Sequence, residues 1–158
     1  MGEKIGFTIG KFAPLHRGHQ LVLETGLREM DRFIVVVYET DCTDIPVQKR
    51  ADWIKELYPE IEIRFAYNPP SKYGLDEESV KVQMEYLSNI IKDVKVTHFY
   101  SSEPYGKCVA DYLGIIDRRV DQERRMFPIS AGKIRDNLEE YSDLVEDIVY
   151  KDLKNERR

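Results

Sequence analysis

Short apolar runs alternate with longer amphipathic stretches along most of the chain. Residues 32–38 (RFIVVVY) are almost continuously apolar and rich in β-branched side chains, which is typical of a parallel strand buried on both faces. Comparable short runs predict four more strands, at 4–10, 61–67, 96–101 and 114–120. Apolar residues at helical spacing predict helices at 19–30, 46–58, 77–92, 107–113 and 143–156.

This alternation predicts an α/β fold: a Rossmann-like open, mostly parallel sheet with helices on both faces. Sheets of this kind bind ligands at the carboxyl ends of their strands. The loop after the first strand, GKFAPLHRGH at 10–19, is therefore the expected site. A chain of 158 residues suits one ordinary core and contains no linker-like segment, so we expect a single domain over 1–158.

Charge and cysteine content narrow the range of partners. A formal net charge of −5 argues against broad binding of nucleic acid, whose phosphates require a basic face. The chain has no apolar run near the ~20 residues of a membrane helix, and its N-terminus lacks the apolar segment of a signal peptide. Cys42 and Cys108 lack CxxC spacing and suit reduced thiols. We expect a cytoplasmic protein without membrane or nucleic-acid partners; the sequence leaves homo-oligomerisation open.

The expected site loop holds two of the three histidines, His16 and His19. A second candidate segment is FPISAGKIRDN at 127–137, where Ser130 is placed to cap a helix and Lys133 and Arg135 follow in its first turns. Helix starts favour anions. Solvated histidines and a solvated charge run remain the simpler alternative, and a zinc site lacks nearby cysteine or carboxylate ligands. P-loop spacing and GxGxxG are absent. Together the two segments favour phosphate binding.

Both segments also resemble known motifs. GKFAPLHRGH is similar to the GxFxPxHxGH motif of the nucleotidyltransferase superfamily, and ISAGKIR resembles its ISxTxxR motif. SSEPYG at 101–106 and VDQER at 120–124 are similar to nicotinamide mononucleotide adenylyltransferases, in particular the domain fused to ribosylnicotinamide kinase in some bacteria. Gly132 stands where that family has Thr or Ser, and a glycine leaves its backbone amide accessible. No tryptophan follows the third strand, where relatives stack one on nicotinamide; Tyr73 is the nearest aromatic residue.

The resemblance implies an enzyme that joins ATP and nicotinamide mononucleotide into NAD and pyrophosphate by direct in-line transfer. His16 and His19 would donate hydrogen bonds to the triphosphate, and Lys11 would lie near the α-phosphate or the acceptor phosphate. Ser130 and Arg135 would hold the outer phosphates. Further nucleotide-binding residues implied by the family motifs are Gly10, Phe12, Gly18, Ser101, Glu103, Arg124, Gly132 and Lys133.

The resemblance implies Mg²⁺ held mainly by ATP phosphates, with no protein metal site. Three alternative functions stay open. The chain could catalyse cytidylyl transfer to an alcohol phosphate or adenylyl transfer to phosphopantetheine, or it could be a catalytically silent sensor of NAD or ATP. The intact histidine pair argues against the sensor, which can lose transition-state contacts without losing binding. Trp53 is expected in the core. Arg50 could contact the acceptor phosphate or be a solvated helix residue.

Overall fold

Five parallel strands form one sheet in the order β3-β2-β1-β4-β5. The computed structural model describes residues 2–71, 74, 76–127 and 129–156. The strands are β1 (Ile5–Gly10), β2 (Arg32–Tyr38), β3 (Glu62–Ala66), β4 (His98–Ser101) and β5 (Ile116–Arg119). Each lies within one or two residues of its predicted range at either end, and the predicted parallel α/β sheet is confirmed.

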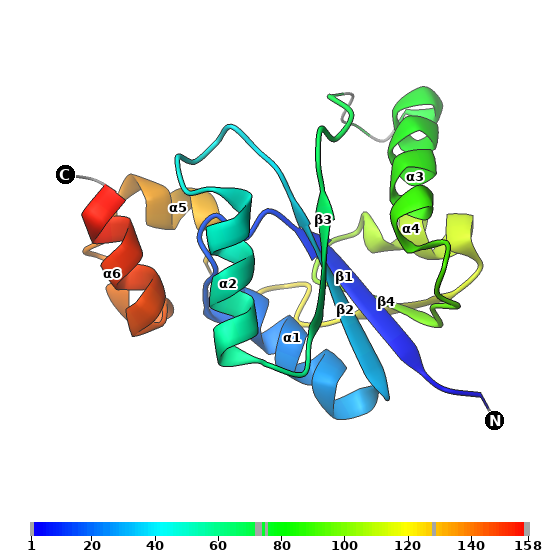
Figure 1. The fold of residues 1–158 in the computed structure, drawn as a ribbon, viewed down its shortest axis with the longest axis horizontal. Helices are drawn as coiled ribbons and strands as arrows, with labels where there is room; N and C mark the ends of the chain where they lie inside the picture. Colours follow the sequence, from blue (N-terminus) through cyan, green and yellow to red (C-terminus); the bar gives the residue numbers. More distant parts are fainter. Residues whose placement is uncertain (1, 72–73, 75, 128, 157–158) are drawn as a thin grey trace.

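Helices cover both faces of this sheet, as predicted (Figure 1). One face packs against α1 (Arg17–Glu29) and α2 (Val47–Leu57), and the other against α3 (Glu77–Ile91) and α4 (Gly106–Leu113). Two further helices, α5 (Ala131–Asp136) and α6 (Asp147–Glu156), lie on the α1–α2 side with a 3-10 turn, Ser142–Leu144, between them. The fold is thus a three-layer arrangement, with the parallel sheet between two helical layers.

Strand β2 shows why its sequence is apolar without alternation. Val35 and Val37 contribute to the core under α1 and α2, whereas Ile34 and Val36 contribute to the core under α3 and α4. All four side chains are fully buried. Because each face of the strand meets a helical layer, neither set of side chains can be polar.

The predicted helix at 143–156 is wrong in its first turn. Val145 is extended, with φ −128° and ψ 153°, and α6 begins only at Asp147. Val145 is buried in the core, and the neighbouring carboxylate of Glu146 accepts a hydrogen bond from Gln20 at 3.1 Å and pairs with Arg17. These contacts with α1 outweigh the local preference for a longer helix.

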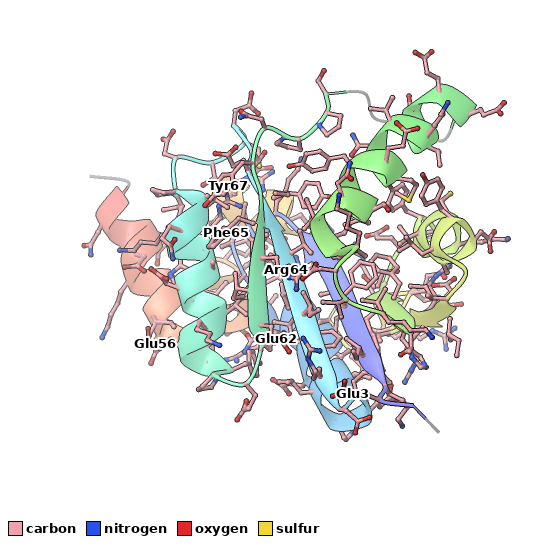
Figure 2. The ribbon with its side chains drawn as sticks, turned by 45° about the vertical axis from the view of Figure 1, so that its right-hand side comes forward. Glu3, Glu56, Glu62, Arg64, Phe65 and Tyr67 are labelled. Atoms are coloured by element: carbon pink, nitrogen blue, oxygen red, sulfur yellow. The ribbon has the colours of Figure 1, made fainter. Side chains whose placement is uncertain are left out.

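Strand β3 is the edge of the sheet and carries charged side chains, as Figure 2 shows for Glu62 and Arg64. Arg32 binds Glu62 with two hydrogen bonds of 2.7 and 2.8 Å. Arg64 pairs with Asp93 and donates to the carbonyl of Ile90 at 2.9 Å. Charged side chains on an edge strand disfavour its pairing with another chain.

Helix α1 can approach β2 closely because it has a glycine at the contact. A Cβ built on Gly26 would lie 2.2 Å from the ring of Phe33, which is 1% exposed and cannot move aside. We therefore expect Gly26→Ala to lower the free energy of unfolding by about 1–3 kcal/mol, although alanine is the better helix former. Urea denaturation would measure the difference.

Gly132→Ala is the matched control, because Gly132 also lies in a helix. A Cβ there would meet nothing nearer than 3.7 Å, which is ordinary contact. This variant should unfold like the wild type or be up to about 1 kcal/mol more stable. Equal destabilisation by both alanines would contradict the packing argument.

Candidate active site

Helix α1 begins with a reciprocal cap between the two histidines of the motif. His16 is the N-cap residue, and its Nδ1 accepts from the backbone N–H of Gly18 at 3.0 Å and of His19 at 3.4 Å. In return the backbone N–H of His16 donates to Nδ1 of His19 at 3.2 Å. The rings stack with centroids 3.7 Å apart. Since Nδ1 is an acceptor in both rings, each neutral imidazole carries its proton on Nε2.

Both rings are held in the neutral form. Burial, with a smaller contribution from Arg124, lowers the pKa of His16 to about 4. Burial also lowers the pKa of His19 well below its usual value, and the charges of His16 and Arg124 act in the same direction. At neutral pH the pair therefore offers two Nε2–H donors without positive charge of its own.

Gly18 is required by the cap itself. A Cβ at this position would lie 2.9 Å from Cε1 and 3.1 Å from Nδ1 of His16, so any side chain would displace the ring. The family motif implied that Gly18 binds the nucleotide; in the structure the space beside this glycine is taken by the capping imidazole. The glycine thus protects the geometry of both histidines.

The side chain of Phe12 packs against the histidine pair. Its ring is 3% exposed and meets His19 edge-on, with centroids 4.9 Å apart. The backbone of Phe12 has φ 52°, a left-handed conformation that is uncommon for a bulky residue. A Cβ on Gly10 would contact this ring at 3.1 Å. Phe12 therefore packs against His19, in addition to the nucleotide-binding role that the family motif implied for it.

A cavity of about 260 Å³ opens at the carboxyl ends of β1, β4 and β5, on the side of α1 and α5. Its wall includes both histidines and most of the other residues that the motifs implicated. The site residues expected from the sequence that line it are Gly10, Phe12, His16, Gly18, His19, Ser101, Glu103, Arg124 and Ser130. Segments more than 100 residues apart thus meet at the sheet edge expected from strand order.

Four expected residues lie elsewhere. Lys11 lines a second cavity. Arg135 points to the loop after β1, where its Nη1 donates to the carbonyl of Ala13 at 2.6 Å. Helix α5 reaches the wall of the first cavity with its first residue, Ala131. Gly132 and Lys133 follow it and do not line that cavity. Ser130 lines the cavity and also caps α5, since its Oγ accepts from the N–H of Lys133 at 3.4 Å.

Glu103 and Arg124 are ion-paired across the cavity wall. Arg124 binds Glu103 through Nη2 and donates through Nη1 to the carbonyl of Ile129 at 2.6 Å. Arg124 has φ 54°, so its backbone is also in the left-handed region. The pair joins the loop after β4 to the loop after β5. The cavity wall thus presents the cation and its carboxylate together.

The carboxylates of this cavity do not form a metal cage. The other one, Asp121, accepts hydrogen bonds from the backbone N–H groups of Arg125 and Met126 at 3.0 and 3.1 Å. Within the described part of the chain, no group of three or more His, Cys, Asp or Glu residues could hold a metal ion. A divalent cation would therefore need oxygen ligands from its substrate.

A second cavity, of about 320 Å³, adjoins the first at the same edge of the sheet, on the face covered by α3 and α4. Ile9 and Gly10 line both cavities, so the end of β1 is their shared wall. The other described residues that line it are Lys11, Tyr38, Gly74, Gln83 and Tyr105. Tyr73, the aromatic residue considered from the sequence, lies outside the described residues. Two adjoining cavities suit two substrates that react with each other.

Sequence reasoning missed most of the second cavity. Tyr38 ends β2, so its position at the carboxyl edge of the sheet was available as a signal. Gln83 lies in the middle of α3 and carries no such signal. Arg50 was considered as a solvated residue or an acceptor ligand; the first is wrong, because Arg50 is only 1% exposed. Trp53 is buried in the core, as expected.

Comparison with curated proteins finds relatives among NAD-synthesis proteins. The trifunctional NAD biosynthesis/regulator protein NadR of Salmonella typhimurium is 26% identical over 154 residues, covering 85% of this chain and 37% of NadR. A Thermotoga maritima protein named "probable nicotinate-nucleotide adenylyltransferase" is 33% identical over 96 residues, covering 58% of this chain and 46% of the relative. The chain thus spans less than half the length of each. No model of a protein family matches the chain.

Solved structures confirm the fold. A NadR protein in complex with NAD and AMP-PNP superposes with a TM-score of 0.65 and 22% identity, over 90% of this chain and 44% of that one. A bifunctional NMN adenylyltransferase/ADP ribose pyrophosphatase from Francisella tularensis, with AMP and a manganese ion, gives a TM-score of 0.63 and 14% identity, over 92% and 43%. The resemblance to these adenylyltransferases inferred from the motifs is confirmed. None of the helices in the described ranges has the length and apolar content needed to cross a membrane.

The neutral histidines make stability depend on pH. The unfolded chain protonates His16 near pH 6.5, whereas the folded chain does so only near pH 4. Protons therefore favour the unfolded state in this window, and the stabilisation present above pH 6.5 is lost as pH falls. We expect a loss of up to about 1.4 kcal/mol per pH unit for each histidine kept neutral. Urea denaturation between pH 7 and 5 would measure it.

Nitrogen-15 spectra of the histidine side chains provide the independent check. At pH 6, His16 and His19 should both give the signature of a neutral ring protonated on Nε2. A charged ring, or a proton on Nδ1 in either residue, would contradict the reciprocal cap.

Proposed function

We propose that this chain is an adenylyltransferase of NAD biosynthesis, which transfers the adenylyl group of ATP to nicotinamide mononucleotide. The observation that carries the proposal is the pair of adjoining cavities at the end of β1, one lined by the two neutral histidines. The similarity to NadR and to a nicotinate-nucleotide adenylyltransferase supports the same reaction class.

In this reaction a phosphate oxygen of the mononucleotide attacks the α-phosphorus of ATP. The new P–O bond forms as the bond to the bridging oxygen of pyrophosphate breaks, and no protein nucleophile is needed. The work of the protein is positioning and charge stabilisation. His16 and His19 would direct their Nε2–H groups at phosphate oxygens that gain charge in the transition state, and Arg124 would add a cation.

Magnesium would arrive with the triphosphate. When bound, it neutralises charge on the phosphate oxygens and keeps part of its water shell. The cavity offers no carboxylate cage, since Glu103 and Asp121 are both engaged. The solved adenylyltransferase that contains AMP and manganese supports a divalent cation in this fold class.

The second cavity would receive the mononucleotide. Lys11 lines this cavity directly after Gly10, which both cavities share, and would pair with the phosphate, while Tyr38 and Tyr105 would flank the ring. Among the described residues lining this cavity, Lys11 is the one that carries positive charge, and Gln83 provides an amide. That amide would exchange hydrogen bonds with the carboxamide of nicotinamide.

The decisive experiment supplies the purified chain with ATP, Mg²⁺ and nicotinamide mononucleotide and measures NAD and pyrophosphate. Nicotinate mononucleotide, CTP with glycerol phosphate, and ATP with phosphopantetheine are run in parallel. Preference for nicotinate mononucleotide would identify it as the acceptor in place of nicotinamide mononucleotide. Turnover only with one of the other substrate pairs would assign the chain to the corresponding transfer reaction. Ligand-induced stabilisation without pyrophosphate from any pair would identify a sensor.

We expect His19→Ala to lower turnover by about 10²–10³, the usual cost of losing one preorganised donor to a developing charge. His16→Ala should lower turnover similarly and also destabilise α1 by about 1 kcal/mol, because the N-cap is lost. Steady-state kinetics and urea denaturation separate the two effects. Wild-type turnover by His19→Ala would refute the catalytic role.

Arg124→Ala should weaken ATP binding by about one to two decades, since a hydrogen bond to a charged group contributes roughly 1.5–3 kcal/mol. Arg125→Ala is the matched control, because the Arg125 side chain is 81% exposed and pairs with Glu123 on the same loop. Calorimetry would measure both affinities. Equal losses in the two variants would indicate a general effect of loop charge.

A further inference from the structure

Among the described residues, one of the largest fully buried side chains is a charged one, Arg50 of α2. Its Nε donates to the carbonyl of Ile45 at 3.1 Å, and its Nη1 donates to the carbonyls of Tyr38, at 2.9 Å, and Lys11. No carboxylate in the described ranges lies within ion-pair distance of this guanidinium. The buried cation is thus stabilised by backbone oxygens rather than by a counter-ion.

Such burial is costly, because a guanidinium loses its hydration. Burial accordingly lowers the pKa of Arg50, although the carboxyl of Glu39 and the thiol of Cys42 oppose the shift. An apolar side chain of similar length would fill the space without this cost. The guanidinium is therefore explained by what it binds: three carbonyls from three separate segments.

Two of these segments form the second cavity. Lys11 lies in the loop between β1 and α1, Tyr38 ends β2, and both residues line that cavity. Arg50 joins their backbones through a single nitrogen, so it sets the separation between the two cavity walls. The same loop is held from the other side by Arg135, which binds the carbonyl of Ala13. Between these two contacts lies Phe12, with its left-handed backbone.

We propose that Arg50 is a positioning residue, which orients Lys11 and Tyr38 for the acceptor substrate by holding their backbone carbonyls. The proposal rests on the function proposed above for the identity of the acceptor. The guanidinium acts through the two residues that line the cavity and does not contact the substrate itself. Its loss should thus impair the acceptor site while the capped histidines keep their geometry.

The test replaces Arg50 by lysine, which keeps the charge but cannot donate to three carbonyls from one planar group. We expect the KM for the mononucleotide to rise on the order of tenfold or more, from the worth of a charge-assisted hydrogen bond. The dissociation constant for ATP should change by less than about twofold, because the contact lies outside the histidine cavity. Backbone amides of residues 11–13 and 15 should exchange hydrogen on the order of tenfold faster.

Arg64→Lys is the matched control. Arg64 also donates to a backbone carbonyl and is partly buried, yet it lies on the edge strand β3, as Figure 2 shows. This variant should keep the wild-type KM and the wild-type exchange of residues 11–13 and 15. A double-mutant cycle of Arg50→Lys with Lys11→Ala should show coupling, since the first change acts through the second residue.

Several outcomes would overturn the inference. These are an unchanged KM with unchanged exchange in Arg50→Lys, equal losses of ATP and acceptor affinity, or failure of both Arg50→Lys and Arg50→Met to fold. Failure of both variants to fold would show that the Arg50 guanidinium is needed for the stability of the core rather than for positioning the acceptor site. The exchange measurement does not depend on turnover, so absence of turnover in the wild type would refute the proposed function alone.

Discussion

The site depends on one local interaction, the reciprocal hydrogen bonds between His16 and His19 at the start of α1. A helix start leaves backbone N–H groups without partners, and here an imidazole nitrogen accepts from two of them. The same bonds determine which ring nitrogens carry protons, hold the rings in stacked contact, and exclude any side chain at position 18. The hydrogen bonds that cap the helix are therefore the same ones that determine the protonation and orientation of both imidazoles.

Around the two histidines, arginine side chains bind backbone carbonyls of the neighbouring loops. Arg50 and Arg135 bind the carbonyls of Lys11 and Ala13, so two guanidiniums from different helices hold alternate residues of one loop. Arg124 binds the carbonyl of Ile129 and also pairs with Glu103. In an acidic protein these arginines concentrate positive charge at one edge of the sheet, and they hold the loops there in defined conformations.

Strand order explains why two cavities adjoin. The chain crosses from β1 to β2 on one side and returns later to β4 on the other, so the end of β1 lies at the switch in direction. Helices on opposite faces leave hollows on either side of that end. Under the proposed function, phosphate groups of the two substrates would meet there, at Ile9 and Gly10, with the histidines on one side and Lys11 on the other. This arrangement supports transfer between two bound nucleotides.

Local sequence was sufficient to predict the elements and to bring both histidines to the carboxyl edge of the sheet. Apolar periodicity identified the strands and helices to within a few residues, because burial on one or two faces leaves a local pattern. The position of GKFAPLHRGH after the first strand located both histidines at the ligand-binding edge. Even the cap is local, since its partners lie within three residues of each other.

Long-range folding assigned the arginines to their partners, and several of them bind the backbone. Arg50 reaches a carbonyl 39 residues away, and Arg135 reaches one 122 residues away. The pairing of Glu103 with Arg124 and the late start of α6 likewise depend on distant partners. A guanidinium has the same appearance in a sequence whether it binds phosphate, carboxylate or carbonyl. Its role follows from the groups that folding brings within hydrogen-bond distance, which no local spacing encodes.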